Sequence, residues 1–132
     1  MRTSTLPPPT IAKIEALARR AFETIPEELG QYVTEVVIRV VDFPDDEVAA
    51  EFDLESPFDL LGLYHGVSMD KKSVADPEGG IDMIFLYRRP ILDYWCETGE
   101  DLAFIVRHVL IHEIGHHFGL SDDDMQRIED QI

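Results

Sequence analysis

The sequence has only one cysteine, Cys96, among its 132 residues. A single thiol excludes the internal disulfide framework that stabilises many small secreted domains, and it fits a reducing compartment. The chain also lacks any run that approaches 18 apolar residues, and its N-terminal segment has no apolar leader region. From these absences we expect a cytoplasmic protein without a membrane partner.

Basic residues are scarce as well. The chain carries 11 lysines and arginines against 27 aspartates and glutamates, which gives a formal net charge of −16. No basic residue stands between Val40 and Asp70, a stretch that holds nine acidic ones. Such a charge repels phosphate backbones, so we expect no nucleic-acid partner. The acids serve solubility in the simpler interpretation, and in the alternative they attract a basic peptide or protein.

Length and apolar content bound the fold. A chain of 132 residues with 45% apolar side chains fits one globular domain with a modest core. The domain is expected to span residues 1–132. Residues 1–9, which end in three prolines, are expected to form a flexible tail.

Periodic patterns predict the secondary structure of the first two thirds of the chain. Thr10 is a candidate N-cap, and apolar residues recur at helical spacing through 11–25, which predicts an N-terminal helix. Ser56, followed by a proline, predicts the start of a short helix. Runs of β-branched or alternating side chains predict strands at 33–41, 62–66 and 81–88.

A long apolar helix is predicted in the last third. Thr98, with Asp101 three residues later, resembles a capping box at its start. The residues that follow are apolar nearly all round, so this helix must lie at the centre of the fold. Gly119 has the position and type of a residue that ends a helix in a left-handed turn. A closing helix is predicted over 122–132.

The stretch 112–122 reads H-E-I-G-H-H-F-G-L-S-D and contains the pattern H-E-x-x-H. Residues four apart lie on one face of a helix, so His112 and His116 can reach one ion at the Zn–N distance of about 2.0–2.1 Å. Glu113 lies beside the ion, where a carboxylate can take a proton from metal-bound water. Without a metal, inward-facing polar groups would stay unpaired, at roughly 1–3 kcal/mol each. The motif therefore predicts a zinc ion, Zn2+.

This stretch resembles the zincin metallopeptidases, and the aspartate at its end resembles the Asp-zincin branch, since metzincins carry histidine there. The resemblance implies that His112, His116 and Asp122 bind one zinc ion and that Glu113 is the catalytic base. A wider similarity to the small bacterial mini-zincins, in 60–66 and 81–90, implies a minimal zincin-like α+β domain. Such a domain has a small mixed sheet packed against an N-terminal helix and a central HExxH helix, with a short C-terminal helix.

The third ligand has alternatives. Ser121 or Asp122 can instead cap the closing helix, where acids favour the helix dipole. Asp124 and Glu129 are then the substitutes, and Glu129 would correspond to the arrangement of the gluzincins. His108 and His117 are interpreted as neighbours of the ligands or as surface residues.

Other features of zincins are left open by the sequence. An edge strand beside a zincin site pairs with extended substrate, and either 62–66 or 81–88 is a candidate for that strand. No Met-turn follows the motif, and the short chain beyond it predicts a shallow cleft. Stabilisation of a tetrahedral intermediate has four candidates, namely Tyr64, His65, Tyr87 and Arg88.

The leading interpretation of function is a zinc-dependent metallopeptidase that hydrolyses a peptide or protein substrate, with basic peptides favoured by the charge. The alternative is a non-catalytic metal-binding or protein-interaction domain of the same fold, against which the presence of Glu113 argues. A metal-dependent ribonuclease with H-x-x-x-H-x-x-G-x-x-H is a third interpretation. It is disfavoured because Asp122 replaces the last histidine and because the net charge opposes an RNA substrate.

Overall fold

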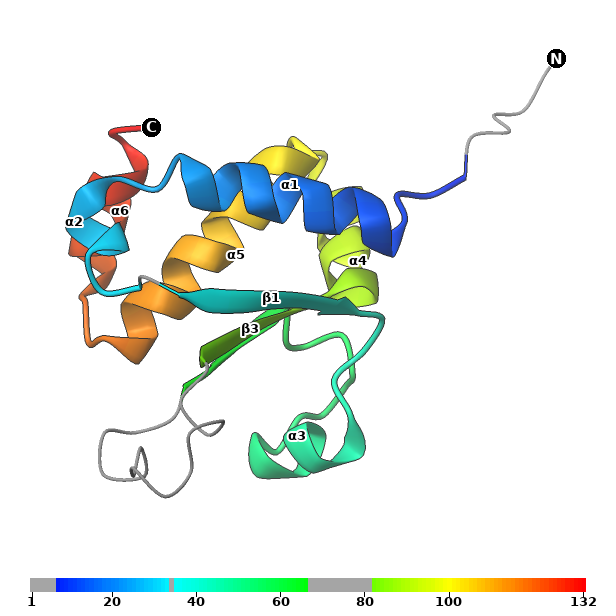
Figure 1. Ribbon diagram of the computed structural model, residues 1–132. Helices are drawn as coiled ribbons and strands as arrows, with labels where there is room; N and C mark the ends of the chain where they lie inside the picture. Colours follow the sequence, from blue (N-terminus) through cyan, green and yellow to red (C-terminus); the bar gives the residue numbers. More distant parts are fainter. Residues whose placement is uncertain (1–6, 34, 67–81) are drawn as a thin grey trace, which may run out of the picture.

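The computed structural model describes residues 7–33, 35–66 and 82–132. The elements of this part of the chain are α1 (Ile11–Glu23), α2 (Glu27–Gly30), β1 (Val36–Val41), α3 (Asp46–Glu51), β2 (Gly62–His65), β3 (Asp82–Tyr87), α4 (Arg88–Thr98), α5 (Leu102–His117) and α6 (Asp122–Glu129). Helices α1 and α5 lie over one face of the sheet, and α3 lies beyond the other face (Figure 1). The predicted α+β class is confirmed. Most of the expected tail, residues 1–6, lies outside the described residues.

The sheet is mixed, as predicted, and its strand order is β1-β3-β2. β1 runs parallel to β3, with Val36 opposite Asp82, whereas β2 runs antiparallel to β3, with Gly62 opposite Leu86. The central position of β3 excludes it as the edge strand beside a site. β2 is an edge strand of the sheet and contacts α5, so the segment 62–66 is the one that can offer an open edge there.

Helix α1 forms where the sequence predicts it. Thr10 is its N-cap, and the Thr10 side chain accepts a hydrogen bond of 3.1 Å from the backbone N–H of Lys13. Ile14, Ala18 and Ala21 form the buried face of the helix. The small alanines let α1 pack closely on α5, because a side chain of one methyl group keeps the two backbones near each other.

The prediction of a helix that starts at Ser56 is wrong. The expected local hydrogen bonds do form, since Ser56 N–H donates to Asp59 Oδ2 at 3.0 Å and Phe58 N–H donates to Ser56 Oγ at 3.2 Å. They close only a turn, because β2 begins at Gly62 and leaves no room for a second helical turn. The short helix of this region is α3, and Asp45 caps it by accepting from Val48 N–H.

Helix α4 was not predicted, and it changes the start of the motif helix. β3 already ends at Tyr87, and Pro90 lies in the first turn of α4, where a backbone N–H would have no partner within the helix. Thr98 therefore does not cap the motif helix; its hydroxyl donates to the carbonyl of Tyr94 at the end of α4. The N-cap of α5 is Asp101, which accepts from Phe104 N–H at 3.3 Å.

The core is centred on α5, as its all-round apolar pattern predicts. Val106, Leu110 and Ile111 are completely buried, and residues from α1, the sheet, α4 and α6 pack around them. No helix of the described chain is both long and apolar enough to cross a membrane.

Tyr87, at the end of β3, makes the stability of this core depend on pH. Its ring is only 2% exposed. Burial raises the pKa of Tyr87 to about 12, and the negative charges of Asp45 and Glu113 act in the same direction. A tyrosine in the unfolded chain ionises near pH 10.

We expect the free energy of unfolding to fall between about pH 10 and the folded pKa of about 12, because the unfolded chain releases the Tyr87 proton first. Tyr87→Phe should remove this part of the pH dependence. Urea unfolding at pH 9, 10 and 11 measures it, and a comparison at pH 7 gives the effect of losing the hydroxyl alone. Parallel curves for the two proteins over the alkaline range would contradict the expectation.

Candidate metal centre

The predicted left-handed turn after α5 directs the chain into α6. Gly119 has φ of 78°, a conformation that glycine adopts without strain. The N–H of Leu120 closes the turn by donating to the carbonyl of Gly115 at 2.8 Å. Ser121 then caps α6 in a capping box with Asp124. The cap proposed for Ser121 is thus confirmed, and Asp122 is the first helical residue.

A glycine inside the motif lets α6 pack against α5. A Cβ atom at Gly115 would come within 2.7 Å of Met125 Cγ, and Met125 is completely buried. This close approach determines where α6 places its two acids, Asp122 at its start and Glu129 at its end.

Three predicted ligands come together in a first cluster, the outer group: His112, His116 and Asp122. One ligand atom of each lies within 4.8 Å of the other two. His116 Nε2 and Asp122 Oδ1 are 3.6 Å apart, which is too long for a hydrogen bond. Two ligands of one tetrahedral zinc ion lie about 3.3 Å apart, given bonds of about 2.0–2.1 Å. The nitrogen and oxygen donors and their spacing therefore fit zinc.

A second cluster, the inner group, consists of His108, His112 and Glu129. His108 Nδ1 and His112 Nε2 each lie 2.9 Å from Glu129 Oε1. Glu129 is 8% exposed and is the buried acid of α6. Burial lowers the pKa of His112, as does nearby His108, whereas the hydrogen bond to Glu129 raises it.

Sequence reasoning missed the inner group, although a signal was present. His108 precedes His112 by four residues, the same spacing that brings His112 and His116 onto one face. The contribution of Glu129 from α6 has no such signal. Glu129 also does not join His116 in any cluster of the described residues, so the gluzincin arrangement of ligands is not formed here.

Asp124, the other substitute ligand, is engaged elsewhere. Its carboxylate accepts from Ser121 N–H in the capping box and forms an ion pair of 3.3 Å with Arg127. Both contacts lower the pKa of Asp124. It belongs to neither cluster of possible ligands among the described residues.

Glu113 connects α5 with the edge strand. Its Oε1 atom accepts a hydrogen bond of 3.3 Å from the backbone N–H of Tyr64. Burial raises the pKa of Glu113, while the Tyr64 N–H and the charge of His116 oppose that shift. Along an antiparallel pair of strands, residues whose backbone groups bond to the neighbouring strand alternate with residues whose backbone groups point away from it. The carbonyl of Leu61 bonds to Tyr87 of β3, so the amide of Tyr64, three residues later, points away from β3 to the open edge of β2.

His117 also lies at this edge. Its ring stacks on Tyr64, with centroids 4.0 Å apart and an interplanar angle of 18°. A Cβ atom at Gly66 would meet the His117 ring at 2.6 Å. The sequence placed His117 at the surface or beside the ligands, and its packing on β2 was not foreseen.

The four candidates for stabilising a tetrahedral intermediate differ in how they are held. The Tyr64 hydroxyl donates to Asp82 at 2.7 Å, and Tyr87 is buried. Arg88 bonds to the Pro9 carbonyl and to Asp42. His65 is exposed on β2. Arg88 is thus committed to the contact between the chain before α1 and the end of β1.

Fold and site define a class of protein: an α+β domain in which a central helix presents H-E-x-x-H beside the open edge of a mixed sheet. Residues 33–132 match the protein family described as "Zincin-like metallopeptidase", and the chain belongs to this family. No curated protein sequence matches it. A conserved hypothetical protein from Thermus thermophilus has a similar structure, with a TM-score of 0.54 and 23% identity over 83% of this chain and 94% of that one. At this identity the likeness concerns the fold alone.

Gly115 provides a test of the packing that positions the ligands. Gly115→Val should destabilise the protein by about 1–3 kcal/mol, because the new methyl groups collide with buried Met125. It should also weaken zinc binding, since α6 carries Asp122. Urea unfolding and zinc titration measure the two effects.

Gly30→Val is the matched control, because a Cβ atom at Gly30 meets nothing within 4 Å. If both variants changed stability and zinc affinity equally, the contact between Gly115 and Met125 would not determine the position of α6.

Proposed function

We propose that this protein is a zinc-dependent metallopeptidase, with zinc held by His112, His116 and Asp122 and with Glu113 as general base. The observation that carries the proposal is the place of Glu113. Its carboxylate is next in sequence to a ligand, and the Tyr64 amide of the edge strand holds it. A structural role alone does not require an acid at this point of a helix. Membership of the zincin-like family supports the same function.

Zinc in such a site supplies Lewis-acid activation of water. Glu113 accepts the proton from the attacking water and then passes it to the leaving amine. Burial raises the pKa of Glu113 and so improves its match to a base that works near neutral pH. The bond from Tyr64 engages Oε1, which leaves Oε2 of the same carboxylate for the proton.

The open edge of β2 is the proposed binding place for the substrate backbone. An extended peptide can add to an exposed strand edge through main-chain hydrogen bonds. Because Tyr64 faces this edge and also bonds to Glu113, a peptide paired there would pass close to the general base. The stacked ring of His117 would lie beside the same segment.

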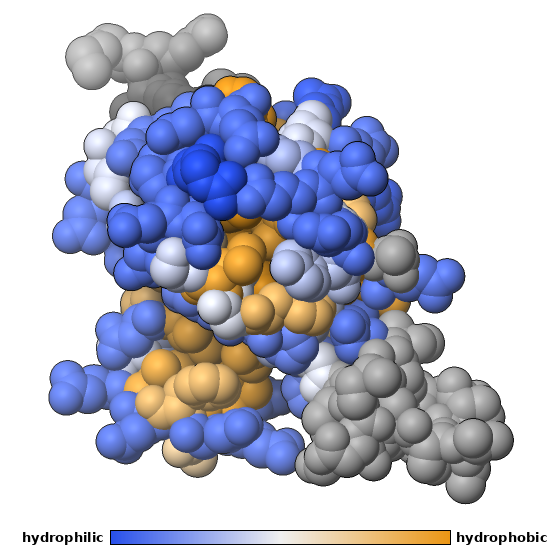
Figure 2. Space-filling model, turned by 90° about the vertical axis from the view of Figure 1, so that its left-hand side faces the viewer, coloured by the Kyte–Doolittle hydropathy of each residue, from blue (hydrophilic) through white to orange (hydrophobic). Residues whose placement is uncertain are grey.

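Basic peptides are the proposed substrates. The formal net charge is −16. On the face that Figure 2 shows, hydrophilic residues surround hydrophobic areas. Asp122 and Asp123 lie exposed at the start of α6, next to the outer group. A negative field concentrates cations near such a site and raises their rate of encounter.

Glu113→Gln tests catalysis separately from metal binding. The amide keeps the size of the carboxylate but cannot accept the proton, so we expect zinc binding to remain and peptide hydrolysis to fall by about 10²–10⁴-fold. Zinc content and cleavage of a diverse peptide library are the measurements. Glu97→Gln, at an exposed position of α4, is the matched control.

If the wild type and Glu113→Gln held zinc and cleaved the library equally poorly, the peptidase proposal would fail. The non-catalytic metal-binding domain would then be the better account of the family motif.

Ionic strength tests the preference for basic peptides. Raising salt from about 0.01 M to 0.15 M shortens the Debye length from about 30 Å to about 8 Å. We expect kcat/KM for a lysine-rich peptide to fall several-fold over this range, while that of a neutral peptide of equal length changes little. An equal response of both peptides would contradict the electrostatic preference.

A further inference from the structure

The inner group contains a buried carboxylate whose partners are both imidazoles. The Glu129 side chain is only 5% exposed, and its Oε1 atom lies 2.9 Å from His108 Nδ1 and 2.9 Å from His112 Nε2. In the described part of the chain, no lysine or arginine forms an ion pair with it. Its imidazole partners are positive only when protonated, and beside neutral imidazoles a buried carboxylate has no compensating charge, which is costly. A cation at this point would offset that cost.

The donors of the inner group suit a transition metal. Two imidazole nitrogens and one glutamate oxygen form a His₂Glu set, which binds zinc in proteins. Both histidines are at hydrogen-bond distance from the carboxylate, His108 Nδ1 at 3.0 Å from Oε2 and His112 Nε2 at 2.9 Å from Oε1, whereas ligands of a tetrahedral zinc lie about 3.3 Å apart. An ion would therefore fit if the distances between the imidazole nitrogens and the carboxylate oxygens grew by a few tenths of an ångström. Rotation of the side chains can provide this increase.

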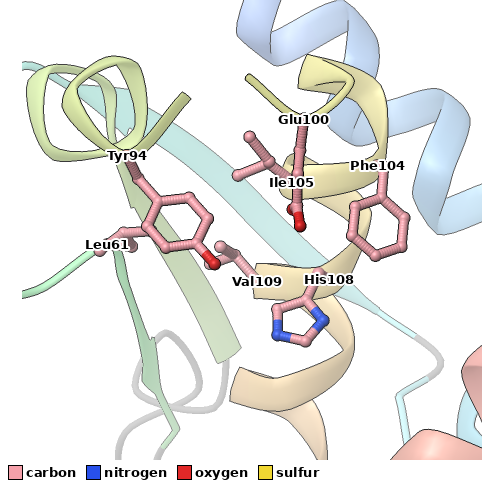
Figure 3. A pocket seen from close by; sticks show the side chains of 7 residues that line it. All are labelled: Leu61, Tyr94, Glu100, Phe104, Ile105, His108 and Val109. Carbon is pink, nitrogen blue, oxygen red and sulfur yellow. The ribbon is translucent and has the colours of Figure 1, made fainter. Parts of the chain in front are cut away.

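The inner group is also accessible. The His108 side chain is 42% exposed. It forms one end of a pocket of about 300 Å³, which Tyr94, Phe104 and Val109 also line (Figure 3). Glu100, in the segment between α4 and α5, extends toward the same hollow (Figure 3). A hydrated cation can thus reach His108 from the pocket.

We propose that His108, His112 and Glu129 form a second binding position for zinc or a similar divalent transition metal, which competes with the outer group for His112. His112 Nε2 can bind one ion at a time. An ion in the inner group therefore leaves His116 and Asp122 as the remaining donors of the outer group. One chain holds one ion, in either of two positions about a helical turn apart.

This second position goes beyond the proposed function, since it concerns where the metal binds and needs no substrate. It implies that metal bound at the inner group is held by a different set of ligands from metal bound beside Glu113. Metal content alone would then not report the fraction of protein that has an ion in the outer group.

The test uses Asp122→Ala, which removes a ligand of the outer group and leaves the inner group whole. We expect Asp122→Ala to bind one Co2+ per chain in a titration followed by visible absorption. The double variant Asp122→Ala/His108→Ala should bind at least tenfold more weakly. Asp122→Ala/His65→Ala is the matched control, because His65 is exposed and belongs to neither group; it should bind like Asp122→Ala.

NMR of the imidazole rings identifies the ligands directly. In Asp122→Ala with Zn2+, a diamagnetic ion whose effect on ring nitrogen shifts is largely confined to its ligands, the ring nitrogen signals of His108 and His112 should show the shifts of bound ligands, and those of His116 should not. Thermal unfolding without metal checks the fold. If the double variant is unfolded, Asp122→Ala/Glu129→Gln takes its place, since glutamine keeps the shape of the side chain.

The proposal is overturned if Asp122→Ala binds no Co2+, if loss of His108 leaves its affinity unchanged, or if the His108 signals do not respond to the metal. None of these results bears on peptide cleavage by the wild type. Conversely, if the wild type and Glu113→Gln cleaved peptides equally poorly, the proposal of a second metal position would be unaffected.

Discussion

The structure depends on the burial of α5, a helix that must fill the core and carry polar ligands at the same time. Val109, Leu110 and Ile111 in its middle are buried and surrounded by other elements. Its donors occur where neighbouring elements leave the helix partly open, so His112 and Glu113 are only half-buried. The core thereby fixes the backbone of the site, and that rigidity is what a metal centre with defined geometry requires.

Two contacts from other elements define what these donors can do. Tyr64 of the edge strand holds Glu113 through a main-chain hydrogen bond, which links the proposed general base to the strand edge proposed for the peptide. On the opposite side, α6 packs on Gly115 and brings one acid to each end of the row formed by His108, His112 and His116. Asp122 pairs with His116 at one end, and Glu129 pairs with His108 and His112 at the other.

The shared position of His112 makes the site different from a simple three-ligand centre. In the outer group its partners are exposed, with 57% of the His116 side chain and 89% of the Asp122 side chain accessible. In the inner group it meets the buried Glu129. An exposed site exchanges ions and substrate easily, whereas a buried carboxylate holds a cation more firmly because water screens it less. The protein thus combines an open candidate ligand set and a more enclosed one along a single helix.

The local features of the fold could be predicted from the amino-acid sequence. The H-E-x-x-H spacing, the cap at Thr10, the left-handed turn at Gly119 and the apolar pattern of the central helix each depend on residues within one or two turns of each other. Local patterns also misled, because the turn signal at Ser56 lacked the room to become a helix. The position of β2 as the edge strand beside Glu113 and the contact between Glu129 and His108 became visible only in the folded chain. These contacts join residues far apart in sequence, and they follow from the packing of whole elements, which no local pattern encodes.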